Sequence, residues 1–275
     1  MRSCSGSCLT CFIFSTHSLH IAISTYLGRK RQFFENSGGS LRLKAAVSEK
    51  ARLESIPDCP ERVHDTSMTL KQVKANGIRD ILEVIFGAKP GQGALVTELT
   101  ASQCMFQIVR TIMENAGFGT NAVTTSLEHP SAFDAVKYYC EKTGREFRVA
   151  MASPKTGGVE LDEILSHIDK NTTLLSVMSA SNVTGYLFDI ETISKEARKI
   201  NPDIFIVSDA VQHMPHGVLD VDNCALDGCT FAPYKAFTPL WVYVFMLCNM
   251  QNLKVFSYRE NRLWIEYNKL RKIEK

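Results

Sequence analysis

Four polar residues in the C-terminal third of the chain are of types that could carry chemistry together. Asp209 and Gln212 follow an apolar, mostly β-branched run, Ile204–Val207, which predicts a buried strand. Tyr234 and Lys235 follow a second short apolar run. Parallel strands end at the same edge of a sheet, where open α/β sheets bind ligands. The sequence therefore predicts a carboxylate, an amide and a primary amine in one crevice.

The pattern Asp-Ala-x-Gln, followed by a strand that ends in x-Lys, resembles the class V aminotransferase and cysteine desulfurase family of fold-type I enzymes. Members of that family use pyridoxal 5′-phosphate. The resemblance implies that Lys235 forms a Schiff base with the cofactor, that Asp209 pairs with its pyridine nitrogen and that Gln212 contacts its phenolic oxygen.

Physical chemistry explains why these residue types are needed. The cofactor withdraws electrons most strongly when its ring nitrogen is protonated, and a buried carboxylate such as Asp209 favours that charged form. A lysine amine such as Lys235 can exchange with the amine of a substrate and then carry a proton.

Three further loops match the family in the expected order. The first, ELTASQ, stands between a predicted strand and a predicted helix. A helix start binds phosphate through its N–H groups, and the resemblance places the cofactor phosphate at Thr100 and Ala101. Leu99 occupies the position where the family usually has glycine. Without the other motifs, an ordinary capped helix start would be the better explanation of this loop.

The second loop contains His129 and the third contains Asn182. By resemblance, the His129 imidazole stacks on the cofactor ring and moves protons, and Asn182 contacts the cofactor oxygen and the substrate carboxylate. An imidazole suits such a role because it is flat and titrates near neutral pH. A capping or surface histidine and a plain turn asparagine are the alternatives.

Several features depart from the family pattern. Ala232 and Tyr234 stand where the family often has a phosphate-binding serine and a histidine; the Tyr234 hydroxyl could still donate a hydrogen bond. No position matches the family's substrate-binding arginine or its sulfur-accepting cysteine. We therefore expect a large domain without the small C-terminal domain. A truncated, inactive cofactor-binding remnant or an interaction protein is the alternative to an active enzyme.

The elements that must position these residues alternate along the chain, which predicts a three-layer αβα sandwich with a mainly parallel sheet. The predicted strands are 94–96, 122–125, 147–150, 173–178, 204–207, 228–231 and 241–247. The predicted helices are 66–86, 102–115, 131–143, 161–168 and 190–200. We expect residues 26–250 to form this domain, between an N-terminal extension (1–25) and a charged tail (251–275).

Composition excludes some functions. The chain has 275 residues, 45% hydrophobic content and a net charge of +2, and no basic stripe interleaved with aromatics indicates nucleic acid. Its N-terminal apolar stretch is too polar to span a bilayer. Most of the nine cysteines stand singly in apolar segments, which favours buried thiols in a reducing cytoplasm. From the resemblance we expect a small amino-acid substrate and a homodimer.

Two metal sites are weaker alternatives. Cys4, Cys8 and Cys11 have a spacing used for iron–sulfur clusters, but the following sequence does not predict the barrel that such chemistry needs. Asp209 with His213 and His216 offers common metal ligands, although Pro215 disturbs their helical spacing. We therefore expect no metal.

Overall fold

The computed structural model describes residues 36–56, 64–90, 93–236 and 244–248. The predictions for the N-terminal extension, the three early cysteines and the charged tail lie outside these ranges. Within them, seven strands form one sheet in the order β1-β7-β6-β5-β4-β2-β3. The strands are β1 (Ala94–Glu98), β2 (Asn121–Thr125), β3 (Glu146–Ala150), β4 (Thr172–Ser176), β5 (Phe205–Asp209), β6 (Gly228–Phe231) and β7 (Val244–Cys248).

The sheet is mainly parallel, as predicted. Strands β3, β2, β4, β5 and β6 pair in parallel, whereas β7 pairs antiparallel with both β6 and β1. Consequently β2, β4, β5 and β6 end at the same edge of the sheet. That edge carries the predicted functional loops.

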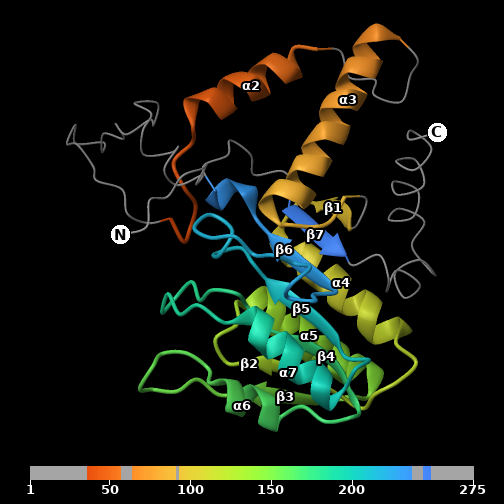
Figure 1. Ribbon diagram of the computed structural model, residues 1–275, viewed down its shortest axis with the longest axis vertical. Helices are drawn as coiled ribbons and strands as arrows, with labels where there is room; N and C mark the ends of the chain where they lie inside the picture. The colour runs from red at the N-terminus through yellow and green to blue at the C-terminus, as the bar shows by residue number, and fades with distance from the viewer. Residues whose placement is uncertain (1–35, 57–63, 91–92, 237–243, 249–275) are drawn as a thin grey trace.

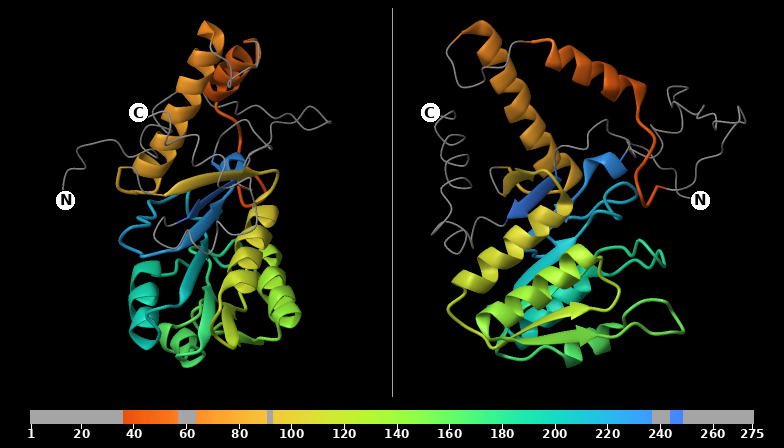
Figure 2. Two further views of the ribbon diagram at one scale, coloured as in Figure 1. Left: turned by 90° about the vertical axis from the view of Figure 1, so that its right-hand side faces the viewer. Right: turned by 180° about the vertical axis from the view of Figure 1, so that it is seen from behind.

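Helices cover both faces of the sheet (Figures 1 and 2). The helical segments are α2 (Lys44–Glu54), α3 (Asp65–Arg79), η1 (Asp80–Ile85), α4 (Ala101–Asn115), α5 (Pro130–Thr143), α6 (Leu161–Ser166), α7 (Ile190–Ile200) and η2 (Pro233–Lys235). Helices α4 and α5 lie on one face, and α6 and α7 lie on the other. The predicted three-layer sandwich is therefore confirmed.

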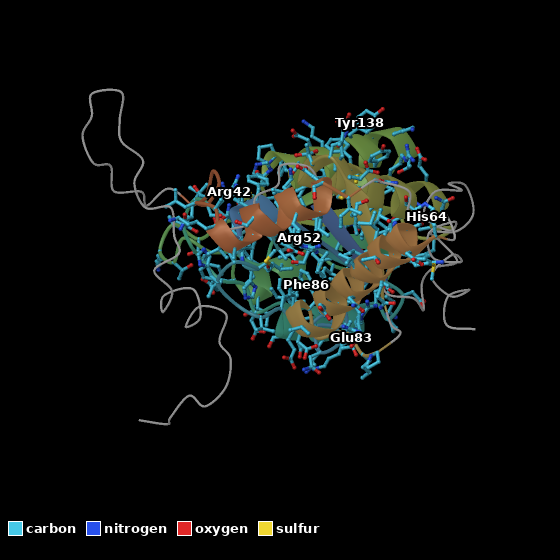
Figure 3. The ribbon with its side chains drawn as sticks, turned by 90° about the horizontal axis from the view of Figure 1, so that it is seen from above. Arg42, Arg52, His64, Glu83, Phe86 and Tyr138 are labelled. Carbon is cyan, nitrogen blue, oxygen red and sulfur yellow. The ribbon has the colours of Figure 1, made fainter. Side chains whose placement is uncertain are left out.

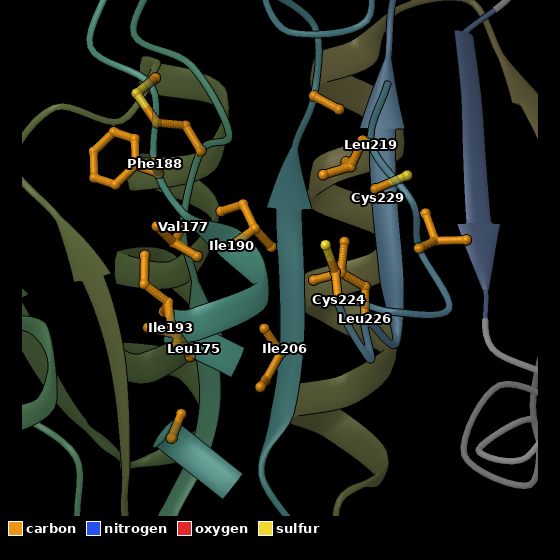
Figure 4. Packing of buried hydrophobic residues seen from close by; sticks show 14 of the residues in the cluster. Leu175, Val177, Phe188, Ile190, Ile193, Ile206, Leu219, Cys224, Leu226 and Cys229 are labelled. Atoms are coloured by element: carbon orange, nitrogen blue, oxygen red, sulfur yellow. The ribbon is translucent and has the colours of Figure 1, made fainter. Parts of the chain in front are cut away.

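The core consists of two apolar clusters, one on each face of the sheet. Successive side chains of a strand point to opposite faces. Accordingly Leu174 and Val207 pack with α4 and α5, whereas Leu175 and Ile206 pack with α7 (Figure 4). Because both faces are covered, β4 and β5 are buried at every position, which explains why their apolar residues are consecutive, as in Leu174–Leu175 and Phe205–Val207, and do not alternate with exposed polar residues.

The predicted single helix over residues 66–86 differs from the structure. Helix α3 ends at Arg79 and continues as the π-helical segment η1. The amide of Phe86 donates to the carbonyl of Ile81 at 3.2 Å, which is the wider spacing of a π-turn. This turn brings the Phe86 ring within 4.7 Å of the Phe231 ring on β6, measured between centroids. Tertiary packing therefore accompanies the change in helical pitch.

Helices α2 and α3 project away from the sheet (Figure 1). No residue of α2 is buried, and only Ser67 of α3 is buried. Seen from above, Arg42 lies at the start of α2 and His64 at the start of α3 (Figure 3). Helix α2 was not predicted from the sequence, because it has no clear apolar face to mark it.

Two further properties concern the described residues only. Cys104, Cys140, Cys224 and Cys229 are buried and form no disulfide, as predicted for these cysteines. In the same ranges, no helix has both the length and the apolar character that crossing a bilayer requires.

Candidate functional site

A pocket of about 210 Å³ opens where the parallel strands end. All of the site residues predicted from the sequence line this pocket. They are Thr100, Ala101, His129, Asn182, Asp209, Gln212, Tyr234 and Lys235. Leu99, Ser102, Ser131, Met178, Ala180, Val211 and Ala232 complete the lining. Residues from five separate connections therefore converge on one cavity.

One wall of the pocket is the N-terminus of α4. Thr100 is the N-cap residue, and its hydroxyl accepts a hydrogen bond from the amide of Gln103 at 3.1 Å. The amides of Ala101 and Ser102 occupy the first two helical positions, where no intrahelical acceptor exists. A helix of 15 residues also carries a partial positive charge at this end. The loop thus caps the helix, and it also presents N–H groups that can bind an anion.

His129 forms the N-cap of α5. Its Nδ1 accepts a hydrogen bond from the amide of Ser131 at 3.2 Å and lies 2.7 Å from the Ser131 hydroxyl. Because Nδ1 accepts from a backbone N–H, a neutral His129 carries its proton on Nε2. The capping interpretation is correct for His129, yet the same ring lines the pocket. Ser131, which also lines the pocket, was not predicted as a site residue. Its position at the start of a predicted helix could have indicated it.

Asp209 ends β5 and is only 6% exposed. Its Oδ1 accepts the amide of Val211 at 3.0 Å. Burial raises the pKa of the Asp209 carboxyl, while the Val211 amide and the charges of His129 and Lys235 oppose that rise. The Asp209 carboxylate and the Lys235 ammonium therefore face one cavity and attract each other.

Lys235 lies in the short 3-10 turn η2, directly after β6. Its Nζ is 5.9 Å from the centroid of the Tyr234 ring. The carbonyl of Tyr234 accepts three hydrogen bonds, from the Ser40 amide at 3.2 Å, the Ser40 hydroxyl at 3.1 Å and Arg42 Nη1 at 2.8 Å. The chain before α2 thus fixes the turn that carries the lysine. The sequence did not indicate these contacts.

Gln212 and Asn182 complete the polar lining. Gln212 Nε2 donates to the carbonyl of Ser37 at 3.1 Å, so its amide also contacts the segment before α2. Asn182 lies in a tight turn in which the Gly185 amide donates to the Ser181 carbonyl at 3.1 Å. The turn interpretation of Asn182 is correct for its backbone, and its side chain lies at the pocket.

The predicted alternative of a metal at Asp209, His213 and His216 gains no support from the geometry. Across the ranges that the structure describes, no group of three or more His, Cys, Asp or Glu residues could hold a metal ion. Burial lowers the pKa of His213, and its ring packs closely against Gly217.

Comparison with known proteins agrees with this fold and pocket. Residues 44–247 match the model of the family described as aminotransferase class-V. The cysteine desulfurase IscS of Buchnera aphidicola subsp. Schizaphis graminum is 35% identical over 122 residues, which are 44% of this chain and 29% of that protein. Human selenocysteine lyase is 26% identical over 125 residues, which are 42% of this chain and 28% of that protein.

Solved structures share the fold. A NifS-like protein superposes with a TM-score of 0.70 at 19% identity, over 80% of this chain and 59% of that one. The apo cysteine desulfurase of Thermococcus onnurineus superposes with a TM-score of 0.65 at 20% identity, over 80% of this chain and 54% of that one.

The parallel sheet, the pocket at its carboxyl edge and the family match define the class of protein: the chain belongs to the aminotransferase class-V family, which is dependent on pyridoxal phosphate. The matched part of the chain spans less than a third of the length of the two curated relatives named here, and less than two thirds of the length of the two solved structures.

Proposed function

We propose that this chain binds pyridoxal 5′-phosphate through Lys235 and belongs to an enzyme that acts on a small amino acid. One observation carries the proposal. Asp209 ends β5, and Lys235 lies in the turn after the neighbouring strand β6; both line the same pocket and attract each other electrostatically.

The residues present fit the chemistry of this cofactor. The N–H groups at the start of α4 suit a phosphate, and Ala101 and Ser102 line the pocket there. The buried Asp209 carboxylate suits a protonated pyridine nitrogen. The amine of Lys235 suits an aldehyde carbon. When bound, pyridoxal phosphate supplies an electron sink for the α-carbon of an amino acid.

The chain's own residues then have defined tasks. Asp209 holds a negative charge in a place largely closed to water, which strengthens its attraction for a cation. Lys235 accepts and returns a proton through Nζ once its amine is released. His129 offers a flat imidazole and an exchangeable proton at Nε2, because Nδ1 is occupied by the Ser131 amide. Gln212 and Asn182 provide amides that orient polar groups of the ligand.

A sulfur- or selenium-containing amino acid is the substrate class that the relatives support. Cysteine desulfurases and a selenocysteine lyase stand among them. Desulfuration, elimination and transamination all begin at the α-carbon, and the described residues do not distinguish between them. Cofactor binding without turnover is the competing outcome.

A homodimer and a cytoplasmic location complete the proposal. Helices α2 and α3 leave almost all of their surface unburied, which supports a contact with a second copy. The buried cysteines, which form no disulfide among the described residues, support a reducing compartment. Sedimentation of the purified full chain tests the dimer.

Two measurements on the purified full chain test the function. Added pyridoxal phosphate should give an absorbance near the visible edge that Lys235→Ala abolishes. Alanine should then form from cysteine in the same sample, and the removed sulfur should appear as sulfide when a thiol reductant such as dithiothreitol is present. Absorbance without product would indicate a binding remnant, and absence of both would contradict the proposal.

A further inference from the structure

A second buried carboxyl, Glu128, lies behind the pocket and has no role in the proposed chemistry. The residue is 8% exposed and precedes His129. Its Oε1 accepts the amide of Met178 at 2.8 Å and the hydroxyl of Thr125 at 2.9 Å. Its Oε2 is buried and has no hydrogen-bond partner among the described residues.

These contacts join three strand ends. Thr125 ends β2, and Met178 stands just after β4. The next residue, Ser179, donates from its amide at 2.9 Å and from its hydroxyl at 3.1 Å to the carbonyl of Asp209 on β5. Glu128 is therefore connected to the backbone of Asp209 through two hydrogen-bonded contacts on the adjacent residues Met178 and Ser179.

The arrangement around Glu128 suits a neutral acid. An ionised carboxylate in a dry site requires a cation or several donors, and Glu128 has two donors, both on one oxygen. Among the described residues, no ion pair reaches Glu128, and the charge acting on it is that of Asp209, which has the same sign. A proton on Oε2 removes this repulsion.

Asp209 differs from Glu128 in its neighbours. His129 and Lys235 both favour its ionised form, whereas no cation does the same for Glu128. When two buried carboxyls repel each other, a proton binds more tightly to the one with the weaker cationic support. Burial accordingly raises the pKa of Glu128 to about 8.

We propose that Glu128 is a positioning residue that stays protonated in the folded protein, ties the His129 loop to β4 and leaves Asp209 as the charged carboxyl of the pocket. The protonation of Glu128 follows from the fold alone. Its importance for Asp209 rests on the proposed function, and the two parts are tested separately.

The first test compares denaturant unfolding of the full chain with that of Glu128→Gln. A carboxyl whose pKa is higher in the folded than in the unfolded state stabilises the folded protein. This stabilisation is complete below the unfolded-state pKa of about 4.5 and is lost as the pH rises towards the folded-state pKa. Glutamine keeps the acceptor oxygen but cannot titrate. The equilibrium constant for folding of the wild type, divided by that of Glu128→Gln, should therefore fall by about tenfold per pH unit between roughly pH 5 and pH 8. Above that range the ratio should be constant.

Glu49→Gln is the matched control. Glu49 accepts hydrogen bonds from Arg52 Nε at 2.8 Å and Arg52 Nη2 at 2.7 Å on the exposed surface of α2. These hydrogen bonds lower the pKa of Glu49, so its carboxyl is ionised in the folded and unfolded states above about pH 5, and the stability of Glu49→Gln should change with pH in parallel to that of the wild type. If Glu128→Gln also ran parallel to the wild type, the proposed protonation would be wrong.

A second measurement covers the case in which Glu128→Gln does not fold. The infrared carbonyl band of a protonated carboxylic acid should be present at about pH 7 in the folded wild type and in folded Asp209→Asn, which lacks the other buried carboxyl of the site, and should disappear on unfolding, because only a raised pKa keeps an acid neutral there. Absence of that band from the folded protein would overturn the proposal.

The second part is tested with added pyridoxal phosphate. Glu128→Gln should bind it within about threefold of the wild type, whereas Glu128→Ala should bind at least tenfold more weakly, because it leaves the Met178 amide without its acceptor. Equal binding by both variants would remove the positioning role. If the wild type bound no cofactor, the proposed function would fail while the proton test would still stand.

Discussion

The carbonyl of Asp209 accepts two hydrogen bonds from Ser179, one from its amide at 2.9 Å and one from its hydroxyl at 3.1 Å. Ser179 follows β4 and Asp209 ends β5, so these bonds lock two neighbouring strand ends together. The acid is fixed before any ligand arrives, and its side chain is fixed in turn by the Val211 amide. Such preorganisation is what a charged recognition group requires.

Asp209→Asn should weaken binding of pyridoxal phosphate without weakening the fold. A hydrogen bond to a charged group contributes about 1.5–3 kcal/mol, or roughly ten- to a hundredfold in affinity. Because burial raises the pKa of Asp209, its charge opposes folding near neutral pH, and the amide should unfold at an equal or higher denaturant concentration. Absorbance titration and denaturant unfolding check the two effects. Asp134→Asn, on the exposed surface of α5, should change neither.

Arg198→Ala should destabilise the domain strongly. The Asp227 side chain is fully buried, and its Oδ2 accepts from Arg198 Nη2 at 2.9 Å and from the Ile206 amide at 2.7 Å. Removing Arg198 leaves a buried carboxylate without its cation between β5 and β6, which costs about 3–5 kcal/mol.

Lys195→Ala is the control for that loss. Lys195 pairs with Glu191 on the exposed side of the same helix, where solvent screens the pair and its contribution to stability is much smaller. Denaturant unfolding of both variants measures the difference. Equal effects would show that the ion pair of Asp227 does not hold the two strands together.

Gly158→Ala should disturb the turn that carries Asn182. A Cβ at Gly158 would lie 2.2 Å from the Tyr186 ring, so the ring and its turn must shift, at a cost of about 1–3 kcal/mol. Gly77→Ala in α3 has open space around the new methyl group and should instead stabilise the protein by about 0.5–1 kcal/mol. The unfolding midpoint should therefore shift down in Gly158→Ala and up in Gly77→Ala. A stable Gly158→Ala would contradict the close packing of the two loops.

The sheet could be predicted from the sequence because its central strands are buried on both faces. A run such as Ile204–Val207 has few alternatives to a buried strand. The site residues could be predicted because each follows a strand of a parallel sheet. His129 and Thr100 also show that capping and pocket lining are compatible, because the same loop end provides both.

Other features depend on contacts between distant parts of the chain. Ser40 and Arg42 bind the carbonyl of Tyr234 across more than 190 residues, and no local pattern encodes that. The π-turn before Phe86 follows from its packing against Phe231. No local pattern marks Glu128 either, and only its burial and its repulsion by Asp209 distinguish it from a surface acid.

The most direct test of the central claim is to locate the covalent attachment of pyridoxal phosphate. The full chain would be mixed with the cofactor, reduced with borohydride to fix any bond to an amine, digested and mapped by mass spectrometry. The geometry predicts one modified residue, Lys235, and loss of that modification in Lys235→Arg with the fold retained. Modification spread over surface lysines such as Lys137 and Lys155, with none at Lys235, would contradict the claim.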